Sequence, residues 1–305
     1  MVTTDYFQPK TLNKITRLEL RARHVVEGFL SGLHRSPYRG FSIEFADHRE
    51  YVPGDDLRHL DWRVYAKADR FYIKQYEVET NLRAYLLLDA SGSMQYPAHH
   101  VEDRMNKWQY ASTIAASLAY LMVKQQDGAG LVLFDHEIRN NLPVSTNQAQ
   151  LHNMVEMIEQ TAPTEETQTK VLFRYLADQL PKRSMVVLIS DLLTDIEELK
   201  DGLERFRFGH HDVMVFHVLD KDELEFPFTD RTLFEGLEYS TDEILTDPQS
   251  LRSAYLERVQ AFIHEIQGIC LNSRIDYAQI STADPLDVVL TRFLSNRMHQ
   301  TRSMA

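Results

Sequence analysis

The sequence has one cysteine, fewer basic than acidic residues, and no long hydrophobic run. Cys270 stands alone among 305 residues, so the chain can form neither an internal disulfide nor a cysteine-rich zinc site. Lysine and arginine together number 33, against 45 aspartates and glutamates, which gives a formal charge of −12. This balance argues against a general binder of nucleic acids or acidic membranes, because binding phosphate groups requires a basic surface.

No apolar segment approaches the roughly 20 residues that a membrane-spanning helix needs. The longest apolar runs, such as Ala84–Leu88 and Met185–Ile189, have the length of strands. The first residues, Met1–Lys10, lack the apolar run followed by small residues that marks a signal peptide. We therefore expect a cytoplasmic protein without direct membrane insertion.

The chain divides into two segments, residues 1–83 and 84–305, which differ in their pattern of apolar and charged residues. In the first segment, apolar residues at helical spacing predict a helix over Leu12–Leu33. A dense block of mixed charges covers Phe45–Arg70, and alternating side chains in Phe71–Glu79 predict a half-exposed strand. We expect the charged block to be an ion-pair scaffold through which the first segment packs on the second. A surface that docks a partner is the alternative.

Short apolar runs alternate with helical patterns from Ala84 onward. Strands are predicted at Ala84–Leu88, Gly130–Phe134, Met185–Ile189, Val213–Leu219 and Asp276–Ile280. Helices are predicted near Lys107–Lys124, Ala149–Gln160, Val171–Leu180, Ile196–Phe206, Leu251–Asn272 and Leu286–Met298. A short antiparallel strand fits Glu137–Leu142, and Leu219–Gly236 is predicted to be a long loop. This alternation predicts an α/β fold with a doubly wound, mainly parallel sheet and helices on both faces.

The strongest chemical signal follows the first strand of this predicted sheet. Asp89, Ser91 and Ser93 are alternate residues just past a buried strand, where doubly wound sheets bind ligands. Asp191 follows another apolar strand and adds a carboxylate at the same edge. One or two carboxylates with neutral hydroxyls are the hard-oxygen ligands that suit Mg²⁺ or Mn²⁺. The alternative is a turn and helix cap without a metal.

The segment from Asp89 to Ser93 resembles the metal-ion-dependent adhesion site of von Willebrand factor type A domains. Those domains are doubly wound α/β folds that bind Mg²⁺ through Asp-x-Ser-x-Ser, a later threonine and a later aspartate. The threonine corresponds to Thr167, with Thr169 as the alternative. The metal ligands that the resemblance implies are Asp89, Ser91, Ser93, Thr167 and Asp191.

A broader resemblance covers about Leu33 to Leu294. The stretch from Glu44 to Arg63, which contains Tyr51-Val-Pro-Gly-Asp-Asp-Leu-Arg-His-Leu-Asp-Trp62, is similar to the bacterial family called domain of unknown function 58. Lys74–Thr80 and Leu224–Phe228 also resemble that family. The resemblance implies a type A-like domain joined to a preceding segment. It also implies a MoxR-type AAA+ ATPase or its client as partner, in chaperone-like assembly or maturation, and brings no established catalytic activity.

Three hypotheses for function follow. The preferred one is a non-enzymatic, metal-dependent protein-binding module, in which a carboxylate from the partner completes the shell of the ion. The second is a Mg²⁺-dependent hydrolase or phosphotransferase with Asp191 or Glu166 as the base. The third is a structural adaptor whose metal motif is vestigial. Cys270, in a predicted helix, is interpreted as a small buried residue rather than a nucleophile.

Overall fold

The computed structural model describes residues 17–35, 48–50, 72–74, 82–97, 104–163, 173, 176–237 and 243–291. The chain separates into two compact units, Ser31–Asn81 and Met1–Leu30 with Leu82–Ala305. In the smaller unit, the described strands β1 (His48–Glu50) and β2 (Tyr72–Lys74) pair in antiparallel fashion. The predicted charged block lies mostly outside the described residues, and so does most of the predicted strand Phe71–Glu79.

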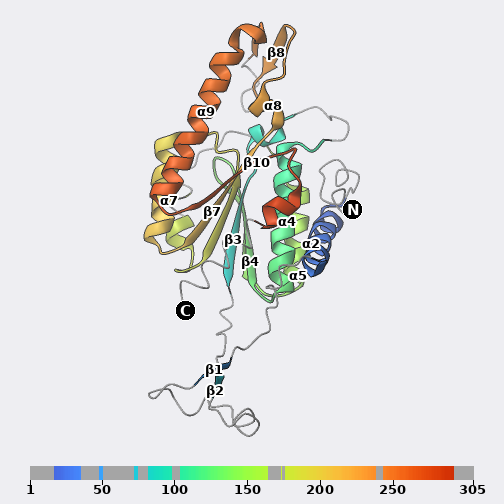
Figure 1. Ribbon diagram of the computed structural model, residues 1–305, viewed down its shortest axis with the longest axis vertical. Helices are drawn as coiled ribbons and strands as arrows, with labels where there is room; N and C mark the ends of the chain where they lie inside the picture. Colours follow the sequence, from blue (N-terminus) through green and yellow to red (C-terminus); the bar gives the residue numbers. More distant parts are fainter. Residues whose placement is uncertain are drawn as a thin grey trace. The chain divides into compact units, whose positions relative to one another are not determined.

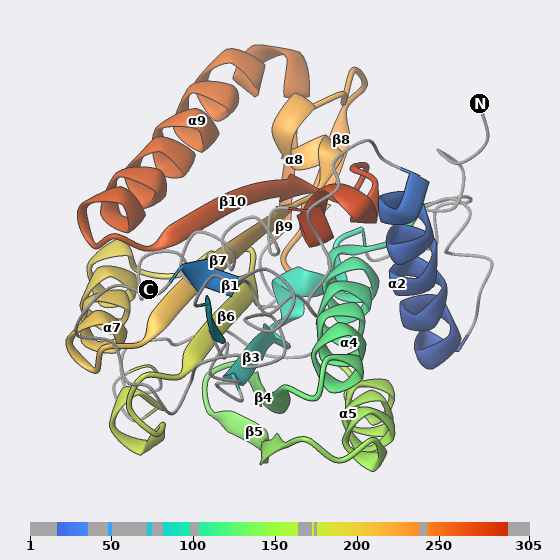
Figure 2. The same ribbon diagram turned by 60° about the horizontal axis from the view of Figure 1, so that its bottom comes forward.

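The larger unit is built on a six-stranded sheet with the order β10-β7-β6-β3-β4-β5 (Figures 1 and 2). All neighbouring strands are parallel except β5, which runs antiparallel to β4 at one edge. The strands are β3 (Arg83–Asp89), β4 (Gly128–Phe134), β5 (Ile138–Ser145), β6 (Met185–Ser190), β7 (Asp212–Leu219) and β10 (Asp276–Ser281). The order reverses direction after β3, which defines a doubly wound sheet and places a switch point beside that strand.

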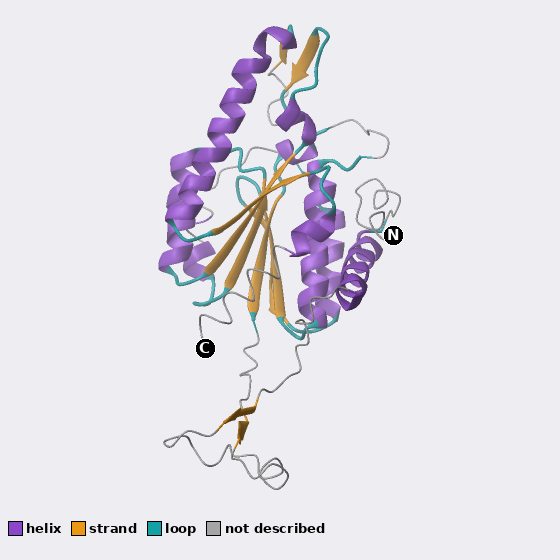
Figure 3. Ribbon diagram, in the orientation of Figure 1, coloured by secondary structure: helices purple, strands orange, loops and turns teal. Residues whose placement is uncertain are grey.

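Helices cover both faces of this sheet (Figure 3). One face carries α4 (Lys107–Lys124) and α5 (Ala149–Gln160), and the other carries α7 (Ile196–Phe208) and α9 (Pro248–Asn272). The first helix, α2 (Leu18–Arg35), packs outside α4, where the Arg21 guanidinium donates to the Thr113 hydroxyl at 3.1 Å. Shorter elements are η3 (Gly92–Gln95), α8 (Lys221–Glu225), β8 (Thr232–Glu235) and β9 (Glu243–Thr246).

The central strands are continuous apolar runs in the sequence because they lie inside the core. Strands β4 and β6 are buried at every position, and β3 at every position after Arg83. A strand with helices on both faces exposes neither set of alternating side chains, so both sets are apolar. One half of the core contains the rings of Phe134, Phe173 and Phe206, which meet edge-on or tilted with neighbouring centroids 5.7 and 5.8 Å apart.

The predicted α/β architecture is confirmed, including the antiparallel edge strand. The prediction of a long loop over Leu219–Gly236 is wrong, because this stretch contains α8 and β8. The first helix is described from Leu18, and residues 12–16 of its predicted range lie outside the described part. Helical residues 286–291 match the start of the helix predicted from Leu286. In the described part of the chain, no helix has the length and apolar character needed to span a membrane.

Cys270 lies in the last turn of α9 and is fully buried among the core side chains. Burial raises the pKa of its thiol to about 12, so the reactive thiolate is scarce at pH 8. We expect a thiol-specific reagent to label the native protein at least about tenfold more slowly than the protein in urea. The variant Leu271→Cys is the control, because this neighbouring position is 76% exposed and should react in the native state. If the native wild type, whose one thiol is Cys270, is labelled as fast as the unfolded protein, Cys270 is not buried.

Candidate metal centre

The carboxyl ends of two adjacent strands bring the predicted acids together. Strands β3 and β6 are parallel neighbours, with Leu88 opposite Ile189, and each is followed at once by polar residues. Asp89 ends β3 and Asp191 follows β6, and both side chains are fully buried. Ser91 lies in the next turn and Ser93 in η3. The structure therefore places four of the predicted ligands at one edge of the sheet.

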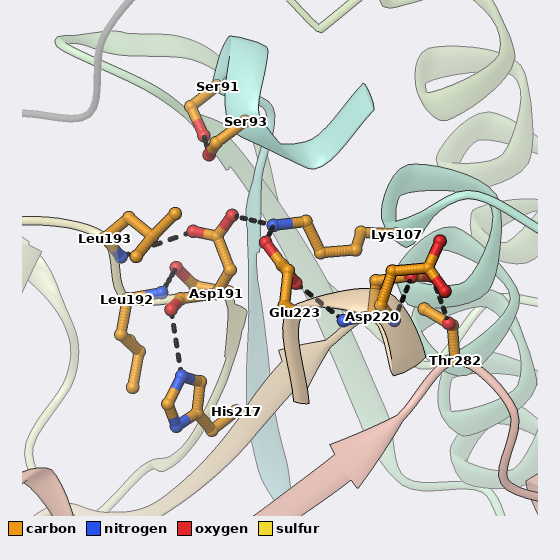
Figure 4. Close-up of polar contacts among 12 residues, drawn as sticks. Ser91, Ser93, Lys107, Asp191, Leu192, Leu193, His217, Asp220, Glu223 and Thr282 are labelled. Atoms are coloured by element: carbon orange, nitrogen blue, oxygen red, sulfur yellow. Dashed lines mark hydrogen bonds and ion pairs between the residues drawn. The ribbon is translucent and has the colours of Figure 1, made fainter. Parts of the chain in front are cut away.

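Hydrogen bonds order the turn after β3. The backbone N–H of Ser91 donates to Asp89 Oδ1 at 2.9 Å. The hydroxyl oxygens of Ser91 and Ser93 are 3.0 Å apart, within hydrogen-bonding distance (Figure 4). Ser91 is fully buried and Ser93 nearly so. The two hydroxyls thus lie side by side at the edge that also carries the acids.

Ser190, which the sequence analysis did not assign a role, ties the two acidic turns to each other. Its hydroxyl donates to Asp89 Oδ2 and accepts the backbone N–H of Leu192 at 2.9 Å. Leu192 adopts a left-handed conformation with φ of 57°, which is uncommon for a branched residue. Strain of this kind persists where the surroundings hold it. The turn after β6 is therefore held by hydrogen bonds in one conformation.

Lys107 is the main feature of the site that sequence reasoning missed. Its ammonium is fully buried and lies 2.7 Å from Asp191 Oδ2 and 2.7 Å from Glu223 Oε1 (Figure 4). It is the first residue of α4, which begins there because Asn106 forms a capping box with Gln109. The buried ammonium of Lys107 therefore links the turn after β6 to helix α8 through two ion pairs.

A second group of polar contacts holds α8 in place. Asp220 caps this helix and accepts hydrogen bonds from the Asp222 N–H at 2.9 Å and the Thr282 hydroxyl at 2.6 Å. Arg104 also forms an ion pair with Asp220. The carboxylate of Glu223 accepts the backbone N–H of Asp220 at 2.6 Å. These contacts direct Glu223 toward Lys107.

His217 supports Asp191 through a hydrogen bond to its backbone carbonyl. Its pKa is lowered to about 4, mainly by burial, so the imidazole is neutral at pH 7. Nε2 is 2.9 Å from the carbonyl oxygen of Asp191, and Nδ1 is 2.8 Å from the hydroxyl of Tyr277. Because a carbonyl can only accept, Nε2 carries the proton and Nδ1 accepts the Tyr277 O–H. Both ring nitrogens are therefore engaged.

The two buried acids differ in their electrostatic surroundings. Burial, and next the charge of Asp191, raise the pKa of Asp89 to about 7 despite its hydrogen bonds. Burial opposes charge on Asp191 as well, but the Lys107 ammonium and the bonds from Lys107 and Ser93 hold its pKa below the usual value. Lys107 satisfies Asp191 but does not directly contact Asp89. A further positive charge near Asp89 would therefore offset the repulsion between the carboxylates of Asp89 and Asp191.

The donor types at this edge suit a divalent cation. Two carboxylates and two hydroxyls are hard oxygen ligands of the kind that Mg²⁺ and Mn²⁺ bind. Thr167, its alternative Thr169, and Glu166 lie outside the described residues. Among the residues that are described, no three histidine, cysteine, aspartate or glutamate side chains are grouped to hold a metal ion. A cation would therefore depend on the hydroxyls as well as on Asp89 and Asp191.

Fold and site together define a class: a doubly wound α/β protein with a buried acid–hydroxyl cluster at the carboxyl edge of its sheet. Residues 47–264 match the family described as protein of unknown function DUF58, and the chain belongs to that family. The resemblance noted from the charged block is thereby confirmed. The likeness to von Willebrand factor type A domains and the association with an ATPase stay predictions.

Relatives with similar sequences are themselves uncharacterized. An uncharacterized protein of Mycobacterium tuberculosis is 26% identical over 257 residues, which span 81% of this chain and 79% of the relative. The same figures apply to an uncharacterized protein of Mycobacterium bovis. Uncharacterized protein YeaD of Bacillus subtilis is 24% identical over 67% of this chain and 46% of its own length.

Solved structures show a more distant likeness. An aerotolerance-related membrane protein from Bacteroides fragilis aligns with a TM-score of 0.47 and 15% identity, over 69% of this chain and 97% of that one. The conserved hypothetical protein BatB from Bacteroides thetaiotaomicron aligns with a TM-score of 0.44 and 13% identity, over 70% and 98%.

Proposed function

We propose that this protein is a non-enzymatic binding module that holds Mg²⁺ or Mn²⁺ at the edge formed by Asp89, Ser91, Ser93 and Asp191. The observation that carries the proposal is the pair of fully buried acids Asp89 and Asp191, which lie beside the hydroxyls of Ser91 and Ser93 at adjacent strand ends. Burying like charges costs free energy that a divalent ion would offset. When bound, the ion supplies a Lewis-acidic charge that an acidic side chain of a partner can bind.

The residues of the chain prepare this edge in three ways. Ser190 orients Asp89, and Lys107 with His217 holds Asp191 from two sides. The two serine hydroxyls contribute oxygen without adding negative charge, so a bound dication would keep part of its charge for a partner. The partner that the family resemblance implies is a MoxR-type AAA+ ATPase or its client, in assembly or maturation in the cytoplasm.

The hydrolase alternative is weaker on these contacts. Asp191 would have to accept a proton, but its pKa is held low by the ion pair with Lys107. His217 has both ring nitrogens in hydrogen bonds and no free position for proton transfer. A general base needs a pKa near the working pH and access to the proton it takes. Asp191 and His217 therefore do not meet these conditions, and neither is a suitable base.

Thermal unfolding with and without Mg²⁺ tests the metal directly. A ligand at a hundredfold excess over its Kd stabilises the native state by about 2.7 kcal/mol, which raises Tm by roughly 4 °C for a chain of this size. We expect this rise in the wild type and its loss in Asp89→Asn. Asp127→Asn is the matched control, because Asp127 is a buried acid just before β4 that accepts the N–H of Leu82, at the opposite end of β3 from Asp89. Equal Tm in both buffers for the wild type would favour the vestigial adaptor.

The partner is tested separately by pull-down of the purified ATPase. Recovery should fall with EDTA and with Asp89→Asn, while Asp127→Asn should retain it. Recovery that is the same in EDTA and in the Asp89 variant would rule out a metal bridge, even if the thermal shift is present.

A further inference from the structure

Helix α8, the β8–β9 ribbon and the first turns of α9 form an arm that continues from the carboxyl end of β7 (Figures 1 and 3). An aromatic cluster joins the parts of this arm. The ring centroid of Phe226 is 4.4 Å from that of Tyr255 on α9 and 5.9 Å from that of Phe234 on β8. The guanidinium of Arg252 donates to the carbonyls of Glu225 and Phe226. These contacts hold α8, β8 and the start of α9 together within the arm.

The strand register shows which side chains the arm leaves uncovered. Phe234 is opposite Ile244, and Leu233 is opposite Leu245. Since side chains alternate between the faces of a ribbon, Leu233 and Leu245 share the face opposite to Phe234. Leu233 is 46% exposed and Leu245 is 56% exposed, while Ile244 is 63% exposed.

Leu251, in the first turn of α9, is 44% exposed. We call Leu233 and Leu245 the apolar patch, because they share one face of the ribbon, whereas Ile244 lies on the face of Phe234. Exposed aliphatic side chains scattered singly need no explanation, but an exposed cross-strand pair of leucines on one face offers an apolar contact surface.

The charges around the apolar patch have one dominant sign. Across residues 230–237 and 243–247, the only base is Arg231 and the acids are Asp230, Glu235, Glu243 and Asp247. All four acids are exposed. Glu235 and Glu243 are direct cross-strand partners, and like charges in that position destabilise a ribbon. A cationic partner would relieve this repulsion while it covers the leucines.

These charges also select among possible occupants. A second copy of this chain would bring the same four acids against each other, and an acidic lipid surface would be repelled in the same way. We propose that the arm binds a basic, amphipathic segment of a partner protein. Apolar side chains of that segment pack on Leu233 and Leu245, and its lysines or arginines pair with Glu235 and Glu243. This contact does not require the metal and is independent of the function proposed above.

The probe is a fluorescent synthetic peptide of about 14 residues, with leucines on one helical face and lysines on the other. A second peptide carries glutamate in place of lysine. Binding to the full chain is measured by anisotropy. We expect the lysine peptide to bind and to weaken about fivefold or more with Leu245→Ser, and likewise with Glu243→Gln. Phe208→Ser is the matched control, since Phe208 is 81% exposed on α7, outside the arm.

Four results would overturn the proposal, three from these assays and one from their repetition in EDTA. The first is an affinity for the lysine peptide that Leu245→Ser leaves unchanged, and the second is equal binding of the glutamate peptide. The third is self-association of the chain, measured by sedimentation, that Leu245→Ser abolishes, which would make a second copy the occupant. Each measurement is repeated in EDTA. Unchanged affinity there supports a metal-independent contact, and lost affinity would assign the peptide to the candidate metal centre instead.

Discussion

Replacing Lys107 by methionine is expected to lower the free energy of unfolding by about 3–5 kcal/mol at pH 7. The ammonium is fully buried and contacts two carboxylates, each at 2.7 Å. Methionine fills a similar volume but leaves Asp191 and Glu223 without their shared counter-charge. Removing one partner of a buried ion pair is costly because the remaining charge has lost its water as well as its partner. Urea unfolding followed by circular dichroism measures the change.

Two further variants show whether the ion pair is the cause. Lys124→Met lies at the exposed end of the same helix and should change stability by less than about 1 kcal/mol. Adding Glu223→Gln to Lys107→Met removes one of the unpaired charges and should recover part of the loss. If Lys107→Met unfolds at the same urea concentration as the wild type, the ion pair adds no net stability.

The second large effect is expected from Phe206→Ala. Phe206 is 1% exposed, and its ring centroid lies 5.8 Å from that of Phe173 and 6.2 Å from that of His211. Truncation removes a buried ring and leaves a cavity, which costs about 3–5 kcal/mol. A Cβ at Gly202, one turn earlier on the same helix, would lie 2.6 Å from Phe173, so this region is already tightly packed.

Phe208 provides a matched comparison on the same helix. It is 81% exposed, and Phe208→Ala should change the free energy of unfolding by no more than about 0.5 kcal/mol. The measurement is the shift in urea midpoint at constant m-value. Similar midpoints for the two alanine variants would show that the packing around Phe206 does not determine stability.

The sheet could be predicted from the sequence because its strands are buried on both faces. Runs such as Met185–Ile189 have no alternation, so their length and spacing identify them without knowledge of neighbours. The acids at the strand ends could be placed for the same reason, since parallel strands end at one edge. The structure confirms that Asp89 and Asp191 lie together at that edge, and their role as ligands stays a prediction.

Other parts of the site could not be predicted from local pattern. Lys107 opens an amphipathic helix, where a lysine is normally interpreted as solvent-exposed, and only its distant partners bury it. Helix α8 has five residues, too few for a hydrophobic period, and the prediction of a loop failed for that reason. One local signal was present: Asp220 followed three residues later by Glu223 has the spacing of a capping box.

The hydrogen bond between Tyr277 and His217 has a consequence for the order of events during synthesis. His217 donates from Nε2 to the Asp191 carbonyl, and Tyr277 on β10, the strand beside β7, donates to Nδ1. A nascent chain that stops before residue 277 therefore lacks the donor to Nδ1 of His217, although it already contains Ser190 and Lys107, which hold the turn after β6. The last strand of the sheet thus completes the hydrogen bonds of His217 late in translation, after the turn that His217 supports has been synthesised.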